Sequence, residues 1–162
     1  MKKKNKNIWA VIIIITISIM ILFSLSYLKK DIWDVNAEQL RHSFDIISGS
    51  AIIDDLYKWT PFDWDVMYSF RPYVSKERVY EVVGYKWDNI SETVNENMNQ
   101  IVFLKDNEVV CYLYGYPNNT GLEFDFGEYE GDYIKFNSND VIPFNSTFDD
   151  ENQIRYFNYI EK

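Results

Sequence analysis

Residues 8–28 constrain this chain more than any other stretch, because they form a predominantly apolar run without a charged residue, a proline or a glycine. As a helix, these 21 residues would be about 31 Å long, which matches the hydrocarbon thickness of a bilayer. The run therefore predicts an N-terminal transmembrane helix. The residues that follow it are polar, acidic and patterned like one folded domain.

The lysines that flank this run predict its orientation. Four lysines precede it and two follow it, and the lysine-richer side of a membrane helix stays in the cytoplasm. We therefore expect a single-pass protein of the cell membrane, with its N-terminus cytoplasmic. Its expected parts are a cytoplasmic basic tail at 1–7, a transmembrane helix at 8–28, a linker at 29–35 and an extracytoplasmic α+β domain at 36–162.

A cleaved signal peptide is the alternative to this uncleaved signal anchor. Ser24 and Ser26 have the spacing of the small residues that a signal peptidase recognises. The apolar run is longer than the roughly 7–15 residues of an ordinary signal-peptide core, which favours the anchor. Cleavage after Ser26 stays open at this point.

The charge of the chain is unevenly distributed. Residues 31–162 contain all 25 acidic residues and only 10 of the 16 basic ones, which gives this part a formal net charge of −15. A domain this acidic repels nucleic acid. It suits a partner protein with a basic surface, although the same charge can serve solubility alone.

Apolar periodicity predicts that the domain is α+β. Helical spacing marks residues 36–48 and 75–83, and the second helix has Ser75 as a capping residue and Gly84 just beyond its end. We expect both helices to pack on a single antiparallel sheet of about five strands. The candidate strands lie at 62–73, 100–104, 109–116, 122–126, 133–136 and 154–160.

Two local patterns make these strand predictions specific. Aromatic and apolar residues alternate with polar ones between 62 and 73, which predicts a buried face with Trp64 and Phe70 and an exposed face with Met67 and Ser69. The dipeptide Asp106–Asn107 separates two apolar runs, which indicates a tight hairpin turn.

Residues 62–116 contain a further pattern, made up of Phe62, Trp64, Asp65, Tyr68, Phe70, Pro72, Tyr73, Gly84, Trp87 and the hairpin residues 101–107. This pattern resembles a group of small uncharacterised membrane-anchored or exported proteins of Gram-positive bacteria. The resemblance implies the same topology, with no activity assigned.

The sequence offers few residues for catalysis. A Cys–His pair would need Cys111 and His42, but Cys111 lies in the most apolar strand, where a buried thiol is inert. Zinc ligands are nearly absent, so no metal or other cofactor is expected. Asp63 and Asp65 are the weak catalytic candidates, because on a strand they would project from one face about 6.5–7 Å apart, as in inverting glycosidases.

A cluster of acids around two glycines is the candidate binding surface. It contains Glu123, Asp125, Glu128, Glu130 and Asp132, whose spacing matches no EF-hand loop. The leading hypothesis is a non-enzymatic domain that binds another macromolecule, for example in an immunity or inhibitor role, with these acids facing a basic protein. The alternatives are a module that binds cell-wall carbohydrate through exposed aromatic rings, and a carboxylate-dependent hydrolase.

Overall fold

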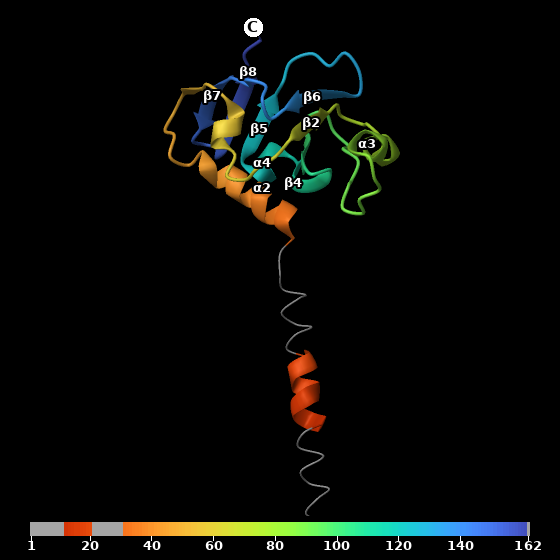
Figure 1. The fold of residues 1–162 in the computed structure, drawn as a ribbon. Helices are drawn as coiled ribbons and strands as arrows, with labels where there is room; N and C mark the ends of the chain where they lie inside the picture. Colours follow the sequence, from red (N-terminus) through yellow and green to blue (C-terminus); the bar gives the residue numbers. More distant parts are fainter. Residues whose placement is uncertain (1–11, 21–30, 162) are drawn as a thin grey trace, which may run out of the picture. The chain divides into compact units, whose positions relative to one another are not determined.

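The computed structural model describes residues 12–20 and 31–161, and the chain divides into two compact units, Met1–Asp31 and Ile32–Lys162 (Figure 1). In the first unit, residues 12–20 are helical, and the hydroxyls of Thr16 and Ser18 donate hydrogen bonds to carbonyl oxygens one turn earlier, at 2.8 and 2.9 Å. The second unit contains every strand in the described part of the chain, and we call it the domain.

The predicted transmembrane helix at residues 8–28 is wrong on this structure. Within the residues described, no helix is both long enough and apolar enough to cross a membrane. The predicted membrane contact, single-pass arrangement and extracytoplasmic location are therefore corrected with it. Residues 8–11 and 21–28, like the basic tail at 1–7, lie outside the described residues.

The two main helices of the domain follow their sequence signals to different degrees. α2, Ile32–Ser43, begins inside the predicted linker and ends before Ser48. α3, Lys76–Val83, is confirmed together with its boundaries: the Ser75 hydroxyl accepts a hydrogen bond from the N–H of Arg78, and Gly84 follows with φ +97°. This left-handed conformation favours glycine, which explains why the helix stops there.

The strands form two four-stranded sheets within the described residues, so the prediction of one antiparallel sheet of about five strands is wrong. One sheet has the order β4-β3-β2-β6 and is antiparallel throughout. The other has the order β1-β7-β8-β5, in which β5 and β8 are parallel. The first sheet contains β2 (Val66–Phe70), β3 (Asn99–Lys105), β4 (Glu108–Gly115) and β6 (Tyr133–Asn137). The second contains β1 (Ala51–Ile53), β5 (Leu122–Asp125), β7 (Phe144–Asp149) and β8 (Ile154–Tyr159).

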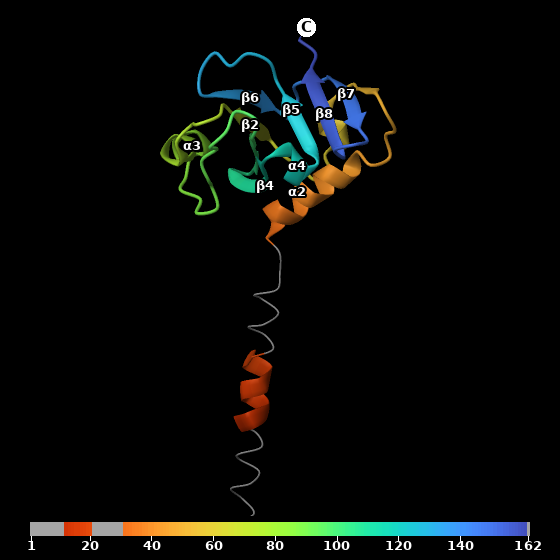
Figure 2. The same ribbon diagram turned by 180° about the vertical axis from the view of Figure 1, so that it is seen from behind.

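The predicted turn at Asp106–Asn107 is confirmed, because both residues have positive φ angles, +51° and +63°. That conformation matches the twist of the two strands that a two-residue hairpin joins. Two short helical segments complete the fold, η1 at Leu56–Trp59 and α4 at Pro117–Thr120. Figures 1 and 2 place β7 and β8 at one side of the domain and α3 at the other, with α2 running along one end (Figure 2).

The apolar core has two parts, one on each face of the β4-β3-β2-β6 sheet. Between the two sheets, Met67 and Phe103 belong to the same buried cluster as Phe144 and Phe157 of the second sheet. On the opposite face, Phe70, Val102 and Tyr112 pack in a cluster with Val79 and Val83 of α3. Both faces of β2 are therefore buried, which corrects the prediction that Met67 and Ser69 face solvent.

Side-chain amides cover two sheet edges. The Asn36 amide on α2 donates a hydrogen bond to the carbonyl oxygen of Val110 in β4, at 2.8 Å. At the edge of the second sheet, the Asn99 amide donates to the carbonyl oxygen of Leu122 at 2.8 Å and accepts from the N–H of Phe124 at 3.2 Å. Asn99 thus pairs with β5 as a neighbouring strand would, and it ties β5 to the start of β3.

Candidate functional site

The junction of β5 with β3 forms a small acidic cavity, which we call the acidic pocket. Its volume is about 200 Å³. Three carboxylates line it, those of Glu96, Glu123 and Asp125, and no lysine or arginine is among its thirteen described lining residues. The other lining residues are Ser69, Phe70, Pro72, Asn97, Met98, Asn99, Gln100, Phe124, Phe126 and Tyr129.

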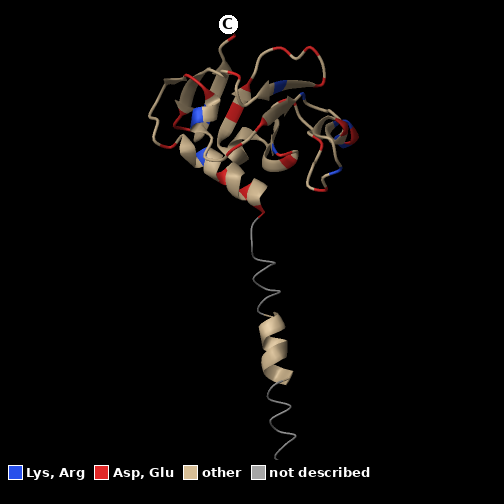
Figure 3. Cartoon of the chain, in the orientation of Figure 1, with Lys and Arg blue, Asp and Glu red and all other residues tan. Residues whose placement is uncertain are grey.

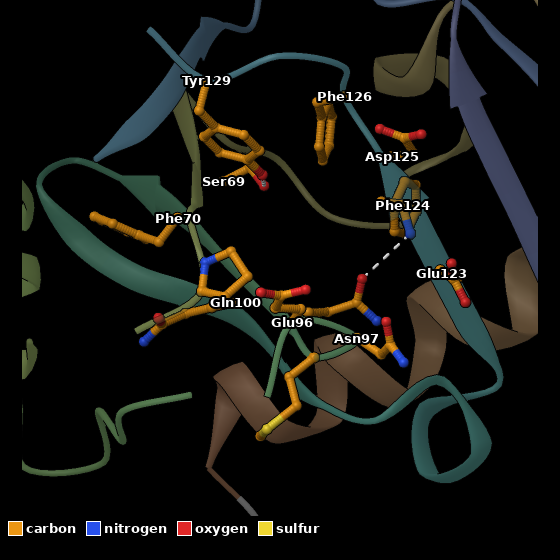
Figure 4. Close-up of a pocket in the computed structure, with 13 residues that line it drawn as sticks. Ser69, Phe70, Glu96, Asn97, Gln100, Glu123, Phe124, Asp125, Phe126 and Tyr129 are labelled. Atoms are coloured by element: carbon orange, nitrogen blue, oxygen red, sulfur yellow. Dashed lines mark hydrogen bonds between the residues drawn. The ribbon is translucent and has the colours of Figure 1, made fainter. Parts of the chain in front are cut away.

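Three segments that are distant in the sequence form the acidic pocket, residues 69–72, 96–100 and 123–129. Figure 4 shows Glu96 at the foot of the pocket, Phe126 and Tyr129 at its top, and Glu123 and Asp125 along the strand at one side (Figure 4). The Tyr129 hydroxyl forms a 2.7 Å hydrogen bond with Ser69 of β2, which anchors the loop that follows β5.

The electrostatics of the acidic pocket favour a positive ligand. Burial, together with the charge of neighbouring Asp125, raises the pKa of the Glu123 carboxyl above its ordinary value. This shift means that the ionised form of Glu123 has a higher free energy here than in water. A cation beside Glu123 and Asp125 would lower that free energy.

The structure separates the five acids that the sequence grouped together. Glu123 and Asp125 line the acidic pocket, whereas Glu128 and Asp132 line a neighbouring open hollow and Glu130 is exposed on the loop. Asp132 is already paired, because its carboxylate accepts a 2.8 Å hydrogen bond from the Nε of Arg78. Figure 3 shows acidic residues on this loop and over much of the rest of the domain (Figure 3).

Glu96 is the acidic lining residue that sequence reasoning missed. It lies in the polar loop before β3, where nothing in the neighbouring residues distinguishes it from the other exposed acids. Its approach to β5 depends on the pairing of Asn99 with Leu122 and Phe124, which is a tertiary contact.

Asp63 and Asp65 lie just before β2, and the Asp65 carboxylate is engaged within the domain. Both oxygens of Asp65 accept hydrogen bonds, one from Lys105 Nζ at 2.6 Å and one from the N–H of Asp106 at 2.9 Å. These bonds lower the pKa of Asp65, which stabilises it as a structural anion.

Cys111 and His42 lie apart in the structure. Cys111 is fully buried in the core between the sheets, and burial raises the pKa of its thiol. His42 is exposed on α2, where its Nδ1 lies 2.8 Å from Asp45 Oδ2. In the part of the chain that the structure describes, no three histidine, cysteine or carboxylate side chains are grouped so that they could hold a metal ion.

Four aromatic rings, from α2, from β4 and from the loop after α3, pack against one another. Trp33 meets Trp87 edge to face with ring centroids 5.2 Å apart, and Trp87 meets Tyr112 in the same way at 5.4 Å. Tyr112 in turn stacks on Tyr114 at 5.4 Å. Rings that face each other offer less flat surface on which a sugar could stack.

Fold and site together define an acidic two-sheet α+β domain with a small carboxylate-lined pocket at the edge of one sheet. Comparison of the chain with protein-family models, with curated proteins and with solved structures finds no match. The resemblance drawn from residues 62–116 therefore stays a prediction.

Proposed function

We propose that the domain is a non-enzymatic binding domain that recognises a basic protein by taking one lysine or arginine side chain into the acidic pocket. The observation that carries this proposal is the composition of the lining, three carboxylates and several aromatic rings without a basic residue. Carboxylates bind ammonium and guanidinium groups by charge-assisted hydrogen bonds, and the faces of aromatic rings attract cations.

The size of the acidic pocket supports a side chain as the ligand. Its volume of about 200 Å³ is below the roughly 300–1,000 Å³ of pockets that enclose whole small molecules. The net charge of −15 on residues 31–162 would also steer a basic partner towards the domain and raise the association rate. One charged side chain would then be held in the pocket, while the rest of the partner contacts the surface around it.

A labelled lysine-rich peptide and the full-length protein provide the test, with binding measured by fluorescence anisotropy. The triple variant E96Q/E123Q/D125N removes the three pocket carboxylates. We expect its dissociation constant to rise about tenfold or more, the effect of losing one charge-assisted hydrogen bond. Binding should also weaken as salt shortens the screening length from about 10 Å at 0.1 M to about 3 Å at 1 M.

A matched variant separates the acidic pocket from overall charge. The triple variant E77Q/E108Q/E151Q also removes three negative charges, but from exposed positions that do not line the pocket. It should bind the peptide with a dissociation constant within about threefold of the parent protein, because surface charges act weakly at a distance in salt. An equal loss of peptide affinity in the two triple variants would show that only net charge matters and would refute the proposal.

A further inference from the structure

A second hollow lies beside the C-terminal end of α2 and is lined by residues of β5, β7 and β8. It shares no lining residue with the acidic pocket. Its volume is about 400 Å³. Arg41 and Arg155 both line it, against the single carboxylate of Asp45. Two guanidinium groups in one cavity are notable in a domain that holds 25 acids and only 10 bases.

Arg155 is a buried cation without an ion-pair partner among the described residues. Its side chain is 4% exposed, and its guanidinium donates only to neutral acceptors, the carbonyl oxygens of Ile47 and Gly49 and the hydroxyl of Ser146. It also lies 5.1 Å from the centre of the Phe148 ring. A guanidinium has five N–H groups, and these three bonds leave two that donate to no described residue. Removal from water lowers the pKa of Arg155, although the charge of Asp45 opposes this shift.

Arg41 is held beside the same cavity by packing. A Cβ atom at Gly121 would lie 3.1 Å from Arg41 Cδ, so the arginine side chain runs closely across this glycine. Its Nη2 is 2.9 Å from His42 Nε2, and the other ring nitrogen of His42 faces the Asp45 carboxylate. Asp45 is therefore occupied by the histidine, and within the described residues neither arginine forms an ion pair with it.

We propose that this hollow binds a small organic monocarboxylate whose remaining atoms are apolar. The carboxylate would accept hydrogen bonds from the two arginines and supply the counter-charge that buried Arg155 lacks. Among the apolar residues of the lining, Phe44 and Leu122 are each 1% exposed and Phe148 is partly exposed, so the Phe148 ring gives the rest of the ligand its main apolar contact. The negative charge of Asp45 disfavours a dianion such as phosphate. The proposal stands independently of the acidic pocket.

Calorimetric titration of the full-length protein with hexanoate tests this site. We expect saturable binding of hexanoate, and none of hexylamine, which has a similar tail and the opposite charge. Arg155 also holds Ile47 and Gly49 through two of its three bonds, so its substitution risks the fold. The informative variant is R41Q, because Arg41 is exposed. It should raise the dissociation constant for hexanoate about tenfold, while the Tm of the free protein stays nearly unchanged.

The control is R71Q, which removes one exposed arginine that does not line the hollow. It should leave hexanoate binding unchanged. The proposal is overturned if hexanoate shows no saturable heat, if R41Q and R71Q weaken binding equally, or if inorganic phosphate binds as tightly as hexanoate. The last result would mean that the two arginines attract any anion and that the apolar contact contributes nothing.

Discussion

The Asp65 carboxylate fastens the β3–β4 turn to the start of β2. Its hydrogen bond from Lys105 and its second bond from the Asp106 N–H lower its pKa in the folded protein. A carboxylate with a lowered folded-state pKa stabilises the fold at pH values above its unfolded pKa, about 3.9. That contribution disappears as the pH falls through the folded-state pKa.

We therefore expect Asp65→Asn to lower the urea midpoint of unfolding at pH 7 and to have a progressively smaller effect as the pH falls below about 3.9. Urea unfolding of both proteins across this range, followed by tryptophan fluorescence, measures the difference. Asp63→Asn is the matched control, because Asp63 is exposed and none of the hydrogen bonds or ion pairs among the described residues uses its side chain. A destabilisation by Asp65→Asn that persists undiminished at low pH would contradict the electrostatic origin.

At the scale of elements, the edge of β5 depends on one side chain. β5 pairs with β8 on one side, and on the other its Leu122 carbonyl and Phe124 N–H bond to the amide of Asn99. Asn99 is 7% exposed, so water cannot readily replace it. A buried backbone group that loses its partner carries the full cost of its desolvation.

Asn99→Ala should lower the free energy of unfolding by about 1–3 kcal/mol, because the Phe124 N–H loses its partner. The Leu122 carbonyl oxygen keeps its hydrogen bond from the Thr120 hydroxyl. Chemical denaturation gives this value directly. Asn97→Ala provides the control at an exposed position two residues earlier, where a change below about 0.5 kcal/mol is expected. If the two variants unfold at the same denaturant concentration, Asn99 does not hold the edge.

The whole molecule has its packed core in one unit. The buried clusters between the sheets and beneath α3 lie within Ile32–Lys162, which is a compact unit of its own. A segment of about 130 residues buries enough apolar surface to fold without a disulfide or a metal.

We expect the fragment 31–162 to fold by itself and to unfold cooperatively. Near-ultraviolet circular dichroism reports the fixed aromatic packing, and a single sigmoidal urea transition reports cooperativity. A far-ultraviolet spectrum of a random coil from the isolated fragment would show that residues 1–30 are needed for folding.

The sequence by itself determined the features that depend on a few neighbouring residues. Ser75 and Gly84 bound α3, and Asp106–Asn107 turns the β3–β4 hairpin, because capping and turn conformation are set by the residue's own side chain and φ preference. Glu123 and Asp125 line the acidic pocket, and their role as binding residues stays a prediction.

The tertiary structure alone decided the number of sheets and the composition of the site. β1 pairs with β7 through Ile53 and Phe144, and the parallel pair β5–β8 closes the second sheet, pairings that no local pattern encodes. The alternation in residues 62–73 predicted one buried face, but β2 lies between two cores and both faces are covered. Glu96 lines the acidic pocket because the start of β3 meets β5, a tertiary contact that no local pattern predicts. Which elements meet depends on the burial of apolar surface across the whole chain, and local propensity does not specify it.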